Sequence, residues 1–134
     1  MTHQEHFRLL VEKARQHRAV ARMLAECDGA PVEALGFHSQ QAAEKLLKAA
    51  VVALDGEYPY THRLGELVDL LRSLGSTPPQ IVEDLVDLTR FAVEYRYDTY
   101  QAGDEVPWDG SRVDSLPGTL AEWVTGLGGQ QESE

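Results

Sequence analysis

Polar side chains suited to binding chemistry gather in residues 32–54, which also carry a clear helical pattern. At about 100° per residue, five of them fall within about 120° of one another, opposite the apolar arc: His38, Gln41, Glu44, Lys45 and Lys48. A histidine and two ammonium groups on one face would suit a phosphate or the carboxylates of a partner. The alternative is a solvated helix face on which Glu44 and Lys48 form an i,i+4 ion pair.

A second candidate site lies at the end of the fourth predicted helix, where Arg96 stands between Tyr95 and Tyr97. An arginine among tyrosines can stack on nucleic-acid bases or be held between the two rings. The alternative is structural, because tyrosines can close the end of a helix bundle while their hydroxyls stay at the surface. The sequence leaves both interpretations open.

Basic residues recur every seven residues along the first predicted helix and form what we call the basic ridge: Arg8, Arg15 and Arg22. This ridge could bind RNA phosphates or an acidic protein surface, and the alternative is ordinary surface arginines. The whole chain carries a formal charge of −10. Such a charge repels phosphate backbones at long range, so a protein partner is favoured over RNA for the ridge.

Thr61 and His62 stand at the predicted start of the third helix. We expect Thr61 to be its N-cap, and His62 either points into a cleft between helices or merely follows the cap. The sequence spacing predicts no metal site, because His3, His6 and His17 lack histidine, cysteine or acidic neighbours at zinc-binding distances along the chain. We therefore expect no metal and no cofactor.

The elements that must position these residues are helices. Apolar residues three and four apart, in stretches free of proline, predict four main helices and a short fifth, over residues 3–26, 32–54, 61–74, 79–96 and 116–127. The second has apolar residues around about half its circumference, which favours a central place in a bundle. We predict an all-α, up-and-down four-helix bundle with a short fifth C-terminal helix. It would form a single domain over 1–127, with a disordered tail over 128–134.

Length and composition narrow the class of protein further. The 134 residues suffice for one domain, and the single cysteine rules out an intrachain disulfide. The longest aliphatic run, residues 49–54, is far shorter than the ~20 residues that span a bilayer. The polar N-terminus lacks the apolar core of a signal peptide. We expect a cytoplasmic protein that does not insert into a membrane.

Three segments together resemble the HEPN family (higher eukaryotes and prokaryotes nucleotide-binding domain). They are the run 37–49 with its Gln-Gln-Ala-Ala-Glu-Lys stretch, the Thr-His-Arg-Leu start of the third helix, and the Tyr-Arg-Tyr sequence after the fourth. The resemblance covers about residues 5–127 and implies a helical bundle. Many prokaryotic members look like partners of a minimal nucleotidyltransferase in toxin–antitoxin pairs, and catalytic members are metal-independent RNases.

The sequence departs from the pattern of the catalytic members, in which a histidine follows an arginine after four to six residues and two protomers share one cleft. After Arg96 the corresponding positions are Gln101, Ala102 and Gly103, and none of the other eight arginines has a histidine at that offset either. The resemblance therefore implies a non-catalytic member. The alternative is a metal-independent RNase with an atypical site, in which Arg96 meets His38 or His62 after folding or dimerisation.

We accordingly expect a binding module that forms a homodimer and binds a nucleotidyltransferase partner, a nucleotide or RNA. The residues that we expect to contact the nucleotide or partner combine the polar helix face with the two later motifs: His38, Gln41, Lys45, Lys48, His62, Tyr95, Arg96 and Tyr97.

Overall fold

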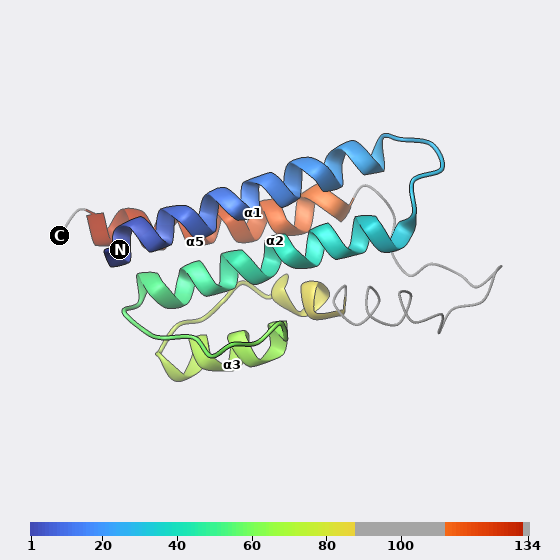
Figure 1. Cartoon of the computed structure of the whole chain (residues 1–134). Coiled ribbons are helices and arrows are strands. Elements are labelled where there is room, and N and C mark those ends of the chain that lie inside the picture. The colour runs from blue at the N-terminus through green and yellow to red at the C-terminus, as the bar shows by residue number, and fades with distance from the viewer. Residues whose placement is uncertain (88–111, 133–134) are drawn as a thin grey trace.

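A computed structural model describes residues 1–87 and 112–132 of the chain (Figure 1). Within them the chain forms the helices α1 (His3–Ala25), α2 (Val32–Ala53), α3 (Leu64–Ser73) and α5 (Arg112–Glu132), and residues 82–87 are helical as well. None of the described residues lies in a strand, so the prediction of an all-helical fold is confirmed. The fourth predicted helix is described only as far as residue 87. Tyr95, Arg96 and Tyr97 therefore lie outside the described residues.

Helix α1 begins with a capping box that its sequence encodes. The Thr2 hydroxyl accepts a hydrogen bond from the Glu5 backbone N–H at 3.1 Å, and the Glu5 carboxylate accepts one from the Thr2 N–H at 3.1 Å. These two bonds satisfy backbone donors that the first turn would otherwise leave without partners. The apolar stripe of the helix, which includes the buried Leu10, Ala14 and Ala21, packs toward the core.

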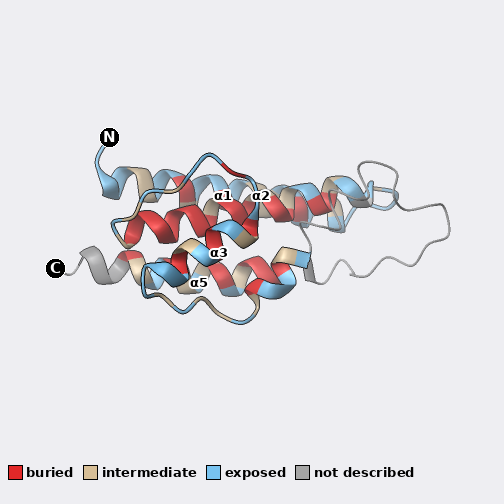
Figure 2. Ribbon diagram, turned by 90° about the horizontal axis from the view of Figure 1, so that it is seen from below, coloured by how far each residue is buried: buried red, intermediate tan, exposed pale blue. Residues whose placement is uncertain are grey.

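Helix α2 is the centre of the molecule, since it contacts α1, α3 and α5 (Figure 1). Buried residues follow it along most of its length (Figure 2). Its small residues, among them the fully buried Ala42, Ala43, Ala49 and Ala50, let neighbouring helices approach closely. The expected central place of this helix is confirmed. No helix in the described part of the chain is long and apolar enough to cross a membrane.

Helices α2 and α3 end in the same hydrogen-bonded arrangement, but with different residues in the left-handed position. After α2, Asp55 has φ 59° and the Gly56 N–H bonds to the Val51 carbonyl at 2.9 Å. After α3, Gly75 has φ 85° and the Ser76 N–H bonds to the carbonyl five residues before it at 3.0 Å. Both are Schellman-type ends, in which glycine is the residue that usually takes the left-handed conformation.

The connection between α2 and α3 returns along α2 before the next helix begins. Residues 54–63 run back beside it, so α3 runs in the same direction as α2 (Figure 1). The N-cap of α3 is Arg63 and not Thr61 as expected. The Thr61 hydroxyl instead accepts a hydrogen bond from the Arg63 backbone N–H at 3.1 Å, which closes a short turn before the helix.

Helix α5 is longer than the sequence predicts, because it begins at Arg112 and ends at Glu132 instead of spanning 116–127. The expected disorder of the tail is therefore wrong for residues 128–132, which are helical. Tertiary packing explains the difference: Gly128 lies so close to the Phe7 ring of α1 that a Cβ there would overlap the Phe7 Cε1 and Cζ atoms. Glycine favours coil by about 1 kcal/mol, and contact with a neighbouring helix can outweigh that preference.

Candidate functional site: a buried carboxylate among two lysines and a histidine

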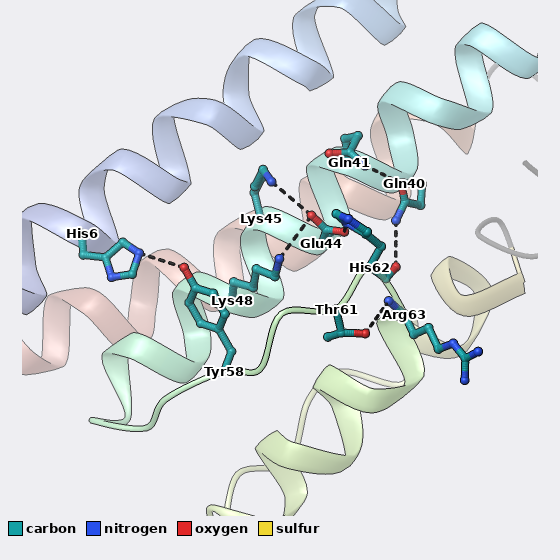
Figure 3. Close-up of polar contacts among 10 residues, drawn as sticks. All are labelled: His6, Gln40, Gln41, Glu44, Lys45, Lys48, Tyr58, Thr61, His62 and Arg63. Atoms are coloured by element: carbon teal, nitrogen blue, oxygen red, sulfur yellow. Dashed lines mark hydrogen bonds and ion pairs between the residues drawn. The ribbon is translucent and has the colours of Figure 1, made fainter. Parts of the chain in front are cut away.

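The carboxylate of Glu44 on α2 is fully buried and lies among three groups that can carry positive charge (Figure 3). Its Oε1 lies 2.8 Å from His62 Nδ1. Its Oε2 lies 3.1 Å from Lys45 Nζ and 3.5 Å from Lys48 Nζ. The group of Glu44, Lys45, Lys48 and His62 is called the Glu44 cluster below.

Electrostatics keep Glu44 ionised despite its burial. Burial alone would raise the pKa of the carboxyl group, but the hydrogen bonds from His62 and Lys45 and the charge of Lys48 outweigh it, so the pKa is lowered. Two ammonium groups then face one carboxylate, which leaves the cluster with an excess positive charge even when the imidazole is neutral. The cluster can therefore attract an anion locally, although the whole chain is acidic.

The position of His62 is fixed at both its side chain and its backbone. An ionised carboxylate can only accept a hydrogen bond, so Nδ1 carries the proton that is shared with Glu44. The backbone carbonyl of His62 accepts a hydrogen bond from Gln40 Nε2 at 3.1 Å, and Gln40 Oε1 accepts one from Gln41 Nε2 at 2.8 Å (Figure 3). The His62 side chain remains 61% exposed, so Nε2 is available to a ligand.

A tyrosine extends the Glu44 cluster toward α1. The Tyr58 hydroxyl lies 2.9 Å from His6 Nε2, and Lys48 Nζ lies 5.2 Å from the centre of the Tyr58 ring, a cation–π distance. Burial and the nearby Glu44 charge raise the pKa of the Tyr58 phenol, which stays neutral. These contacts hold Lys48 against α2 and leave its charge paired within the protein (Figure 3).

Exposed side chains border the cluster on its outer side. The Tyr60 residue is 93% exposed, and its ring lies edge-on to the His62 ring with centroids 5.4 Å apart. The Arg63 side chain, 82% exposed, comes directly after His62 and approaches Glu66 at 3.7 Å. The Tyr60 ring thus lies beside the imidazole, whereas the Arg63 side chain extends away from it (Figure 3).

Four of the residues that the sequence suggested meet in or beside this cluster: Gln41, Lys45, Lys48 and His62. The alternative of a solvated helix face is wrong, because Glu44 and Lys48 are buried, although their i,i+4 ion pair is present. His38 bonds elsewhere, since its Nδ1 lies 3.0 Å from the Nδ1 of His17 on α1. Within the basic ridge, Arg15 pairs with Glu12 at 2.7 Å on the exposed face of α1.

Sequence reasoning missed Gln40, Tyr58 and His6. Gln40 lies between His38 and Gln41 in the chain but outside the predicted face, and its role depends on a backbone carbonyl 22 residues away. Tyr58 lies in a connection, 52 residues from its partner His6. Helical periodicity reports the faces of one element and cannot show such contacts. Among residues 1–87 and 112–132, no group of three or more histidine, cysteine or acidic side chains could hold a metal ion.

Comparison with known proteins identifies the class to which this helical chain belongs. The model of the HEPN domain matches residues 7–114, which is most of the chain, so the protein belongs to the HEPN family. The resemblance read from the sequence is thereby confirmed. No curated protein and no solved structure matches the chain.

Proposed function

We propose that this HEPN chain is a non-catalytic module that binds a nucleotide, with the phosphates held beside His62 and Lys45. The observation that carries the proposal is the charge of the Glu44 cluster, in which one buried carboxylate faces two ammonium groups and an imidazole. The absence of the family's arginine–histidine RNase motif from the whole sequence supports a binding role.

The exposed groups favour a phosphate ligand with an attached base. The partly exposed Lys45 ammonium can donate a charge-assisted hydrogen bond to a phosphate oxygen, and His62 Nε2 can do the same when the imidazole carries a second proton. Tyr60 offers an open ring on which a base can stack. The acidic remainder of the chain opposes a long polyanion more strongly than a small one, so a free nucleotide is favoured over RNA.

The experiment is isothermal titration calorimetry of the purified chain with nucleoside mono- and triphosphates, and with inorganic phosphate as the minimal anion. We expect Lys45→Ala and His62→Ala each to weaken nucleotide binding by tenfold or more. Arg72→Ala removes one positive charge at the far end of α3 and is the matched control, with an expected effect below twofold. Equal affinity in all three variants, or no binding heat with any nucleotide, would contradict the proposal.

The family membership also supports a partner. We propose a minimal nucleotidyltransferase, within a cytoplasmic toxin–antitoxin pair in which the HEPN chain forms a homodimer, as the sequence resemblance implies. Co-purification with a nucleotidyltransferase encoded beside this chain tests the partnership, and light scattering on the chain alone tests the dimer. A chain that stays monomeric and does not retain the enzyme would overturn this part.

A second candidate function is metal-independent RNA cleavage, favoured by one observation. Glu44 orients the His62 imidazole as carboxylates orient the general bases of hydrolases, leaving Nε2 free to take a proton from a ribose hydroxyl. Cleavage of RNA in the presence of a chelator, abolished by both His62→Ala and Arg96→Ala, would establish it. If neither variant changes the RNA products, this second candidate is wrong.

A further inference from the structure

We infer, resting on the proposed function, that its nucleotide is a nucleoside monophosphate whose phosphate contacts both His62 Nε2 and the Lys45 ammonium. One carboxylate holds both of these side chains. Glu44 Oε1 lies 2.8 Å from His62 Nδ1, and Glu44 Oε2 lies 3.1 Å from Lys45 Nζ (Figure 3). The two groups are thus neighbours that a single phosphate can contact together.

The charge of the Glu44 cluster matches one phosphate better than a chain of three. With the imidazole neutral, two ammonium groups and one carboxylate leave one excess positive charge, and a second imidazole proton raises it to two. A phosphate monoester carries about −1.5 to −2 charges at pH 7. Lys48 contributes charge but, with 8% of its side chain exposed, is too buried to hold a second phosphate. Further phosphates would therefore face the field of a chain whose formal charge is −10.

The carboxylate of the cluster is not available to the magnesium ion that usually accompanies a triphosphate. Protein sites hold that Mg²⁺ through one or two carboxylates together with the phosphates of the ligand. Glu44 cannot take this part, because it is fully buried and both its oxygens already contact protein groups. The cluster thus favours a ligand that needs no accompanying cation.

The hydrogen bonds open to His62 require a proton to enter with the phosphate. Nδ1 shares its proton with Glu44, so a neutral imidazole presents only the Nε2 lone pair to the ligand. An ionised phosphate oxygen also presents only lone pairs. A bond between the two atoms therefore forms when one proton is added from solvent, to Nε2 or to the phosphate.

The groups around the imidazole bear on this proton from several elements. On α2 the Glu44 carboxylate favours it, whereas the ammonium groups of Lys45 and Lys48 oppose it. A phosphate at Nε2 places a second anion beside the ring and so favours the proton once the ligand is bound. Other titratable groups nearby are neutral or paired near pH 7: His17 of α1, Tyr58 of the connection, and Arg63 with Glu66 on α3.

The test is calorimetric titration of the full chain at about pH 7.5 with AMP, GMP, CMP and UMP, then with the corresponding triphosphates and a short RNA that carries a 5′-phosphate. Each titration is run with and without Mg²⁺. We expect the best monophosphate to bind about tenfold or more tightly than its triphosphate or the RNA, with or without the ion. A triphosphate or RNA that binds as tightly would overturn this inference and leave nucleotide binding intact. No heat with any ligand would contradict the proposed function itself.

Proton uptake is a second readout, available on the unchanged chain if a variant fails to fold. Calorimetry in two buffers with different enthalpies of ionisation counts the protons that enter with the ligand. We expect about one proton per bound monophosphate at about pH 7.5, and none in His62→Gln, whose amide can donate without an added proton. The Arg72→Ala control should keep the uptake. Monophosphate binding without proton uptake in the unchanged chain would overturn the contact with Nε2.

Discussion

At the scale of one residue, the contacts that stabilise the buried Glu44 carboxylate also arrange the side chains of the proposed binding site. Removing an ionised carboxylate from water costs several kcal/mol unless charged and hydrogen-bonded partners replace the water. Here Lys45, Lys48 and His62 replace it. The same contacts orient the imidazole and leave positive charge in excess, so stability and anion binding depend on one side chain.

Replacing Glu44 with alanine should therefore destabilise the protein strongly. Glu44→Ala leaves the buried Lys48 ammonium without its carboxylate, and we expect a loss of about 2–4 kcal/mol in the free energy of unfolding. Urea unfolding followed by circular dichroism measures it. The control is Glu12→Ala, which removes an exposed ion pair with Arg15 and should change little. Similar losses in the two variants would show that the burial of Glu44 does not matter.

The sequence predicted part of this site and could not predict the rest. A helical wheel places Gln41, Lys45 and Lys48 on one face because all three belong to one helix. It cannot show that the returning connection covers that face, which is why the solvated interpretation was open. The pairing of His17 with His38 has the same origin, since these residues are 21 apart in the chain and meet only because α1 packs on α2. Sequence spacing therefore indicated no histidine cluster.

At the scale of the element, a helix ends where turn-forming residues follow it, unless packing against another helix extends it. The first two predicted helices, 3–26 and 32–54, end within a residue of the observed Ala25 and Ala53, because turn residues follow each. The last helix differs by four or five residues at each end. The glycines of this helix disfavour the helical conformation, and its contact with α1 offsets that preference.

Substitution of two glycines of α5 can separate the effect of helix propensity on stability from the effect of packing. Gly126→Ala meets no atom within 4 Å, so alanine should stabilise the helix by up to about 1 kcal/mol. Gly128→Ala has the same propensity gain but places a methyl group against Phe7, and overpacking typically costs about 1–3 kcal/mol. Thermal unfolding should rank Gly126→Ala above Gly128→Ala. The reverse order would mean that α5 does not pack closely on the start of α1.

At the scale of the whole molecule, α2 is both the central helix of the fold and the helix that carries the polar groups described above. It packs against three helices and also carries Glu44 and His38, so both polar groups are built into the core helix. Stability should therefore respond to the titration of these groups as one cooperative unit.

The pH dependence of unfolding tests this coupling. In the folded chain the pKa values of His17 and His38 are lowered from 6.5, so the unfolded chain binds protons more readily below that pH. The free energy of unfolding should thus fall as the pH drops below about 6.5, and fall again below about 4.5, where the lowered pKa of Glu44 acts in the same direction. Urea unfolding at about pH 7.5 and 5.5 measures the first loss. The double variant His17→Asn/His38→Asn should show a smaller difference between these two pH values, and an unchanged one would contradict the assignment.

Residues 54–63 run back along α2, so the length of this connection determines whether the His62 imidazole reaches Glu44. Each residue advances an extended chain by about 3.3–3.6 Å, more than the 2.8 Å that separates His62 from Glu44. Shortening the segment by one residue would thus draw the ring out of reach of its carboxylate without altering any residue that touches a ligand. Natural variation in the length of this span therefore offers evolution a way to disable or retune the site while every helix remains intact.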